Sequence, residues 1–278
     1  MGDIAQGPVR CSMRGDGVAV LTLDNPPLNV VFRGLTEALG RALDALALDA
    51  AVRAVVITGA GTRAFCAGSD IAEFQPLMRP GRIGPEKLEL QHRVFAQLDD
   101  FTKPTVAAVN GLAFGGGLEI AVCCDLIVAD QKARFALPEI KLGVFPGSGG
   151  PVRVTRRVGE GRAKELMFLG EPIDAPTALA WGLVNRVVPP GAALDAALAL
   201  AATLAQRPPL ALALCKQAIA VSFDMTRDAA IAAALPLSER VFTSAESREG
   251  VRAFLAKETP VFPNALHDTL HDTPRNSP

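Results

Sequence analysis

Short strand-like runs alternate with helix-like segments along the first half of this 278-residue chain. The runs are rich in β-branched residues and alanine, as in strands that are covered on both faces, and they lie at 18–23, 52–58, 105–109 and 125–129. Apolar residues at helical spacing predict helices between them, over 33–48, 86–101 and 116–123. This alternation predicts an α/β architecture with crossover connections.

The last third of the chain is richer in alanine and leucine. Its periodicity predicts four more helices, over 192–206, 209–222, 227–242 and 246–257. Thr243 and Glu246 have the spacing of a capping box at the start of the last helix. We therefore expect three parts: an α/β core over 1–191, a helical region over 192–263 and a frayed polar tail over 264–278.

Composition argues against several classes of protein. The chain is 49% hydrophobic with a net charge of −1, so it can bury a large core but lacks the electrostatic footprint of a nucleic-acid binder. Its five cysteines form no CxxC pair, which argues against a zinc site or a disulfide framework and favours a reducing cytoplasm. No signal sequence or membrane span is recognisable, so we expect a cytoplasmic protein without membrane partners.

Two glycine-rich turns can bring bare backbone amides close to a ligand. The first turn is 65–70, and the second is 110–119, which includes Gly115, Gly116 and Gly117. Glycine lets main chain approach without side-chain obstruction, and two amides aimed at one point form an oxyanion hole. A close contact between a helix and a strand is an alternative explanation for the three consecutive glycines.

Glu119 and Glu139 are acids in apolar surroundings. Buried acids are rare unless they are paired or functional. The interval of 20 residues between them has room for a helix, a strand and a turn, which would let both reach one site. Two carboxylates beside an oxyanion hole can move protons around an enolate, and this is the chemistry that the features favour together.

Other motifs have simpler explanations. Residues 59–64 mimic a GxGxxA dinucleotide fingerprint, but the sequence after them cannot form the long helix that such a site requires, so we expect a tight turn. His267 and His271 have metal-ligand spacing but no third ligand, so no metal site is expected. Cys66 has no histidine nearby to activate it, and we expect it to pack in the core.

In this combination the motifs resemble the crotonase superfamily, which contains the enoyl-CoA hydratases and isomerases. The resemblance extends over roughly residues 9–263, and it is carried by segments 64–70, 103–111, 115–119, 138–139, 145–150, 180–184 and 254–257. It implies a spiral of repeated ββα turns, followed by helices that serve trimer assembly. Trimers of this family commonly pair into hexamers.

The resemblance also implies a role for each motif residue. The backbone amides of Ser69 and Gly116 would form the oxyanion hole. Glu119 would activate a water for addition at C3, and Glu139 would exchange the proton at C2. Gly147 matches a backbone donor that orients this water.

Coenzyme A would be part of the thioester substrate, and no separate cofactor is expected. The carbonyl of Ala67, beside Gly68, matches the acceptor for the adenine amino group. Arg63 matches a basic position near the phosphates. Lys257 and Phe262 match a C-terminal segment that can touch the nucleotide bound to a neighbouring subunit.

Several positions depart from the family pattern. Ser69 replaces a common alanine but keeps its backbone amide, and Ala72 stands where many hydratases carry lysine. Pro151 removes a backbone donor from the segment after Gly150. Residues 73–90, in the region that shapes the acyl pocket of the family, are peculiar to this chain.

The function implied is that of an enoyl-CoA hydratase, which adds water reversibly across the 2,3 double bond of a 2-enoyl-CoA. Carnitinyl-CoA dehydratase is an alternative, because 114–117, 135–139 and 181–188 also resemble that branch. A 3,2-enoyl-CoA isomerase is another, although it typically needs only one of the two acids. An RNA-binding protein on the same fold is a third alternative, which the absence of a basic segment disfavours.

Overall fold

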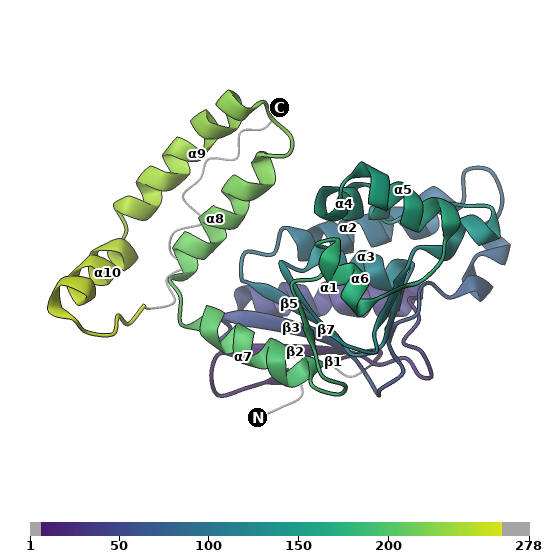
Figure 1. The fold of residues 1–278 in the computed structure, drawn as a ribbon, viewed down its shortest axis with the longest axis horizontal. Coiled ribbons are helices and arrows are strands. Elements are labelled where there is room, and N and C mark those ends of the chain that lie inside the picture. The colour runs from purple at the N-terminus through teal and green to yellow at the C-terminus, as the bar shows by residue number, and fades with distance from the viewer. Residues whose placement is uncertain (1–6, 263–278) are drawn as a thin grey trace.

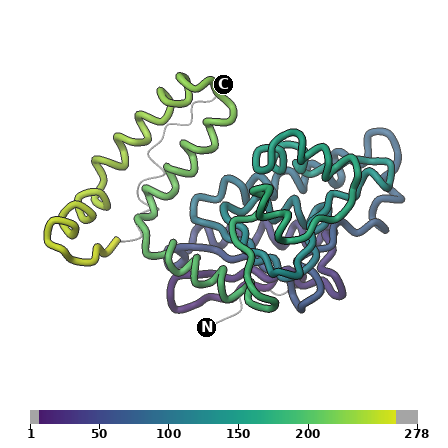
Figure 2. Tube along the Cα trace, in the orientation of Figure 1, coloured from purple at the N-terminus to yellow at the C-terminus, as the bar shows by residue number. Residues whose placement is uncertain are grey.

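The computed structural model describes residues 7–262 (Figure 1). The predicted tail over 264–278, with His267 and His271, lies outside the described residues. An α/β core contains the first part of the chain, and a helical arm extends away from it (Figure 2).

The larger sheet of the core has the strand order β1-β2-β3-β5-β7-β10. Its strands are β1 (Val9–Met13), β2 (Val18–Leu23), β3 (Ala54–Gly59), β5 (Thr105–Val109), β7 (Leu126–Asp130) and β10 (Arg186–Val188). β1 and β2 pair antiparallel, and every other pair in this sheet is parallel. The parallel pairing confirms the crossover connections predicted from the sequence.

A second sheet has four short strands in the order β4-β6-β8-β9. They are β4 (Ala64–Cys66), β6 (Leu112–Phe114), β8 (Arg134–Ala136) and β9 (Ile173–Asp174). β4, β6 and β8 follow β3, β5 and β7 along the chain, so each of these three strands of the large sheet continues into one of the small sheet before the next α-helix. This repeat of two strands and a helix is the ββα spiral that the family resemblance implies.

The helices of the core cover the large sheet on both faces. They are α1 (Arg33–Leu48), α2 (Glu89–Asp99), α3 (Gly116–Cys123), α4 (Gly150–Val158), α5 (Glu160–Leu169), α6 (Ala175–Ala180) and α7 (Ala193–Ala205). On β3, Val55 and Ile57 join the main core with α1, whereas Ala54 and Val56 pack against α7. Both faces of the strand are therefore buried, as its composition predicts.

Short helical turns complete the core. η1 (Ile71–Glu73) and η2 (Gln75–Leu77) follow β4, and η4 (Pro138–Leu142) follows β8. The helix predicted over 86–101 begins with a π-helical turn, η3 (Gly84–Leu88), which continues into α2. Residues 60–63 form the turn between β3 and β4, with Gly59 and Ala64 at the ends of these strands, so the dinucleotide fingerprint over 59–64 does not open a helix.

The arm consists of α8 (Pro209–Val221), α9 (Arg227–Phe242) and α10 (Ala245–Ala256), as predicted to within a few residues (Figure 1). The predicted capping box is wrong, because Ser244 caps α10 with its hydroxyl. The Glu246 carboxylate is 4% exposed and accepts instead from the amides of Leu210 and Ala211, at 3.0 and 3.2 Å. These amides begin α8, where unpaired N–H groups and the helix dipole stabilise an anion.

No single helix in the described part of the chain is long and apolar enough to cross a membrane. α7 and α8 taken together have the length and composition of a membrane span, but the two helices are bent by 108° at their junction.

Candidate active site

Ser69 and Gly116 face each other across a small gap. Val31 pairs with the turn at 68–70: its amide donates to the Gly68 carbonyl at 2.7 Å, and its carbonyl accepts from the Asp70 amide at 2.8 Å. In this parallel pairing the Ser69 amide points away from Val31. Gly116 is the first residue of α3, and its amide has no acceptor within the helix. A Cβ at Gly116 would lie 3.3 Å from Ser69 Oγ and 3.8 Å from Ser69 N. The fold thus brings both predicted oxyanion donors together.

Each glycine of the run at 115–117 is required for a different reason. A Cβ at Gly117 would collide with the Cys66 carbonyl, which is the helix–strand contact of the alternative explanation. Gly115 has a φ of 48°, and a Cβ there would lie 2.7 Å from Glu139 Oε1. Packing therefore explains Gly117, whereas Gly115 and Gly116 keep space open beside Glu139 and Ser69.

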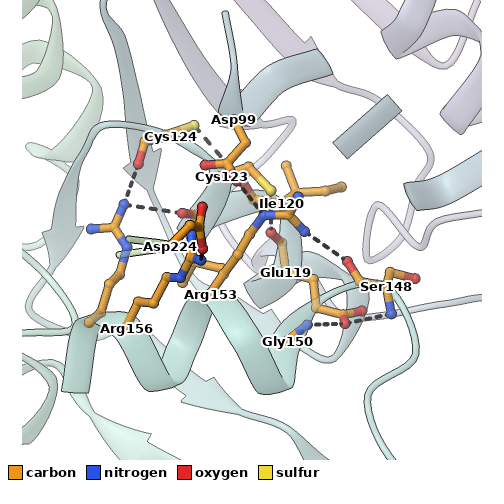
Figure 3. Close-up of polar contacts among 12 residues, drawn as sticks. Asp99, Glu119, Ile120, Cys123, Cys124, Ser148, Gly150, Arg153, Arg156 and Asp224 are labelled. Atoms are coloured by element: carbon orange, nitrogen blue, oxygen red, sulfur yellow. Dashed lines mark hydrogen bonds and ion pairs between the residues drawn. The ribbon is translucent and has the colours of Figure 1, made fainter. Parts of the chain in front are cut away.

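The Glu119 carboxylate is buried in the first turn of α3, with 3% of the residue exposed. Its Oε1 accepts from the backbone amides of Ser148 and Gly150, both at 2.8 Å (Figure 3). Burial raises the pKa of Glu119, and these two hydrogen bonds oppose that rise. Pro151 follows in the first turn of α4, where an amide has no acceptor within the helix, so its missing N–H costs that helix no hydrogen bond.

Arg153 anchors the loop whose backbone amides contact Glu119. Its Nε donates to Asp99 Oδ2 at 2.7 Å, and its Nη1 donates to the Ser148 carbonyl at 3.2 Å (Figure 3). The arginine therefore ties α4 to the end of α2 and holds the carbonyl of Ser148, the residue whose own amide donates to Glu119. No role was assigned to Ser148 or Arg153 from the sequence. Ser148 lies in the matching segment 145–150, and Arg153 lies three residues beyond it.

Glu139 lies in η4, half-buried, on the other side of Gly115. Its Oε2 is buried and has no hydrogen-bond partner among the described residues. Burial, reinforced by repulsion from Glu119, raises the pKa of Glu139 to about 7. The two acids are therefore close enough to influence one another, and one oxygen of Glu139 is left unpaired among the described residues.

Replacing Glu139 with glutamine is expected to stabilise the fold at alkaline pH. The pKa is about 7 in the folded chain and 4.5 in the reference state, so folding loses stability as the pH rises from 4.5 through 7. Since each pKa unit is worth about 1.4 kcal/mol, Glu139→Gln should raise the free energy of unfolding by roughly 1–3 kcal/mol at pH 8. Urea denaturation at pH 8 and pH 4 measures this gain, which should vanish at the lower pH; an equal gain at both would contradict the shifted pKa.

From the sequence, Cys66 is expected in the core, and Gly147, Arg63, Ala67 and Gly68 are expected in the site. Cys66 is buried, and burial raises the pKa of its thiol to about 12, which agrees with a packing role. Gly147 lies against Leu88, whose Cδ2 would be 3.0 Å from a Cβ at this glycine. Arg63 is exposed in the turn before β4, and Ala67 and Gly68 lie between β4 and Ser69.

Lys257 and Phe262 do not join this centre within one chain. Lys257 ends α10, which Figure 1 places well away from α3. The Phe262 carbonyl accepts from Arg53 Nη1 at 2.9 Å, near the start of β3, and its ring faces Gly250.

The two-sheet ββα spiral and its C-terminal helices define a protein of the crotonase fold. Residues 13–265 match the family model described as enoyl-CoA hydratase/isomerase, and the chain belongs to this family. It is 39% identical to 2,3-dehydroadipyl-CoA hydratase of Escherichia coli, over 90% of this chain and 96% of that protein. It is 38% identical to the short-chain-enoyl-CoA hydratase of Clostridium acetobutylicum, over 86% of this chain and 92% of that protein.

Solved structures agree with this family. An enoyl-CoA hydratase of Bacillus anthracis superimposes with a TM-score of 0.88 at 31% identity, over 93% of this chain and 100% of that one. The DspI protein of Pseudomonas aeruginosa superimposes with a TM-score of 0.88 at 34% identity, over 94% of this chain and 98% of that one.

Proposed function

We propose that this protein is an enoyl-CoA hydratase that adds water reversibly across the 2,3 double bond of a 2-enoyl-CoA. The observation that carries the proposal is the pair of electrostatically coupled carboxylates, Glu119 and Glu139, on the helix and turn that flank Gly115. Similar proteins named as enoyl-CoA hydratases support it.

The thioester carbonyl would accept from the amides of Ser69 and Gly116, which stabilise its oxygen as the enolate charge develops. Glu119 would take a proton from water, and the resulting hydroxide would bond to C3. Glu139, half-protonated near neutral pH because its pKa is about 7, would donate its proton to C2. Dehydration follows the same steps in reverse, and Gly147 would help to orient the water.

Coenzyme A would lie along the turn that precedes Ser69. We assign the Ala67 carbonyl, beside Gly68, to the adenine amino group and Arg63 to the phosphates. Arg63 is exposed and therefore open to an anionic ligand. In this proposal coenzyme A is part of the substrate, and the chemistry relies on the two carboxylates and the backbone amides.

Three thioesters distinguish the proposed reaction from its alternatives. Crotonyl-CoA should lose its conjugated-thioester absorbance when the protein is added, and a 3-enoyl-CoA should not gain it. Gain of absorbance from the 3-enoyl-CoA alone would instead establish an isomerase, and turnover restricted to crotonobetainyl-CoA would establish the carnitinyl-CoA dehydratase. Salt-sensitive RNA binding without turnover of any thioester would support the RNA-binding alternative.

The helical arm is proposed to assemble the protein into trimers, which pair into hexamers. Large apolar side chains are exposed along it, including Phe223, Ile231, Leu235, Phe242, Phe254 and Leu255. Such a surface is typical of a subunit interface. In the trimer Lys257 and Phe262 would reach the nucleotide of a neighbouring site.

Sedimentation of the full chain tests this assembly. A trimer of 29.1 kDa chains should sediment at about 87 kDa, and a hexamer at twice that mass. Replacement of Phe242 and Leu235 with serine should shift the protein toward the monomer, because burying these side chains would no longer favour association. A monomer of the unmodified chain at micromolar concentration would contradict the proposal.

A further inference from the structure

Arg153 is a partly buried cation on α4 whose charge the proposed mechanism does not use. Its side chain is 15% exposed, and its guanidinium contacts the backbone of the loop over 148–150 (Figure 3). A Cβ at Gly149, which has a φ of 100°, would collide with Arg153 Nη1. Glycine is therefore required at position 149 both by the backbone conformation and by the arginine. The loop is shaped to admit this guanidinium.

A chain of hydrogen bonds leads from Asp99 through Arg153 to the residue that contacts Glu119. Arg153 Nε donates to Asp99 Oδ2 at 2.7 Å, and Arg153 Nη1 donates to the Ser148 carbonyl at 3.2 Å. The Ser148 amide in turn donates to Glu119 Oε1 at 2.8 Å. Asp99 therefore fixes the guanidinium, and only Ser148 separates this guanidinium from the Glu119 carboxylate along the chain of contacts.

Anchoring the loop does not by itself require a positive charge. The loop has a second anchor on α2, because the side chains of Ser148 and Gln91 are hydrogen-bonded at 2.7 Å. Gln91 is neutral, whereas an arginine side chain stays charged throughout the physiological pH range. What Arg153 adds to this anchoring is therefore its charge.

Ionisable groups on four elements surround Glu119. Burial raises the pKa of Glu119, and the charge of Arg153 on α4 opposes this rise. Glu139 in η4 has the same sign as Glu119, so the two carboxylates repel one another. Asp99 on α2 is also acidic, but it is paired with Arg153 and 41% exposed to solvent. The Cys123 thiol, one turn along α3, is neutral because burial raises its pKa. Arg153 is thus the cation among these groups.

The two acids of the site have different surroundings. Glu119 Oε1 accepts from the amides of Ser148 and Gly150, and Arg153 lies behind the loop that carries them. Glu139 Oε2 is buried without a hydrogen-bond partner among the described residues. Hydrogen bonds and an opposite charge favour the ionised form of a carboxyl group, whereas burial without them favours the protonated form. Two acids whose pKa values are pushed apart in this way can act as base and acid.

We infer that Arg153 is the positioning residue that puts the negative charge of the carboxylate pair on Glu119 and leaves the proton on Glu139. Asp99 contributes by holding the guanidinium in place. This inference rests on the proposed hydratase function, in which Glu119 takes a proton from water while Glu139 gives one to C2. Without the cation the two acids would share the proton more evenly, and a smaller fraction of the protein would be ready to hydrate its substrate.

The pH dependence of crotonyl-CoA hydration by Arg153→Met tests this role. The variant lacks the charge, so Glu119 should ionise at higher pH and the rate should fall most on the acid side. We expect the ratio of its kcat/KM to that of the unmodified protein to drop by about 3- to 10-fold between pH 8 and pH 5. A merely structural role would lower kcat/KM by the same factor at both pH values. A ratio that does not change with pH would therefore overturn the inference.

Two further variants decide the question even if Arg153→Met fails to fold. Asp99→Asn keeps an oxygen acceptor for Arg153 Nε but removes a negative charge, so the potential at Glu119 becomes more positive. Its ratio should rise between pH 8 and pH 5, and a ratio that falls or stays level would overturn the inference. Arg153→Lys keeps the charge, so its ratio should change less with pH than that of Arg153→Met. An equal change in both would exclude the charge as the cause.

Arg156→Met is the matched control for these measurements. Arg156 also lies on α4, but it pairs with Asp224 and lies over the Phe223 ring instead of contacting the loop over 148–150. Its ratio should be the same at pH 8 and pH 5. A fall like that expected for Arg153→Met would overturn the assignment to Arg153.

Failure of this inference can be told from failure of the proposed function. Hydration of crotonyl-CoA by the unmodified protein, with a ratio in Arg153→Met that is level across the pH range, would overturn the inference and leave the hydratase intact. An unmodified protein that hydrates no 2-enoyl-CoA at any pH would overturn both.

Discussion

Glu139→Gln is expected to lower kcat for hydration of crotonyl-CoA by about 100-fold or more, which is the scale of general acid–base catalysis. Glutamine keeps the shape of the side chain but cannot donate the proton that C2 requires. The carboxyl group is suited to this role because its pKa of about 7 leaves it partly protonated at neutral pH. Loss of conjugated-thioester absorbance under saturating substrate measures kcat directly.

Glu165→Gln provides the control for charge removal. Glu165 lies exposed on α5, outside the site, so this variant should keep full activity. Urea denaturation adds a second check, because Glu139→Gln should be more stable than the unmodified protein at pH 8 while being nearly inactive. A Glu139→Gln variant with more than a tenth of the original kcat would remove Glu139 from the proposed chemistry.

Gly116→Val is expected to reduce kcat by roughly 100- to 1,000-fold, the cost of losing one oxyanion donor. A Cβ at this position would lie 3.3 Å from Ser69 Oγ and 3.6 Å from Val31 Cγ2, so a branched side chain would fill the gap between the two amides. The thioester oxygen could then no longer reach both donors. Initial rates with crotonyl-CoA, together with circular dichroism to establish folding, measure the effect.

Ser69→Ala is the matched control for this gap. It removes the hydroxyl but keeps the backbone amide, which is the only part of Ser69 that the proposed mechanism uses. We expect kcat within a few-fold of the original value. A loss as large as that of Gly116→Val would assign the contribution of Ser69 to its side chain and would contradict the role proposed for its backbone amide.

Long segments of this fold were predictable from the sequence. The bounds predicted for α1, β5 and α3 agree with the structure, because each is an amphipathic or apolar run that is flanked by glycine, proline or polar residues. The short strands β4, β6 and β8 were not predicted, because three residues are too few to establish a period. Their pairing depends on neighbours that are distant in the sequence.

The residues of the candidate site also divide into those with a local sequence signal and those that depend on distant contacts. Gly116, Glu119 and Glu139 stood out because glycine runs and apolar-flanked acids are unusual locally, whereas Ser69 followed from the family resemblance. Arg153 acts through contacts with Asp99 and Ser148, 54 and 5 residues away, which no local pattern reveals. Glu246 fits a local capping box yet caps α8, because tertiary contact overrides the local signal.

A crystal structure of the protein with a bound 3-hydroxyacyl-CoA tests the proposed mechanism most directly. We predict that the thioester oxygen lies about 2.7–3.1 Å from the amide nitrogens of both Ser69 and Gly116, the range typical of oxyanion donors. The Glu139 carboxylate should face C2, and Glu119 should contact the hydroxyl on C3. A thioester oxygen bound away from these two amides, or an acid turned from the acyl carbons, would contradict the mechanism.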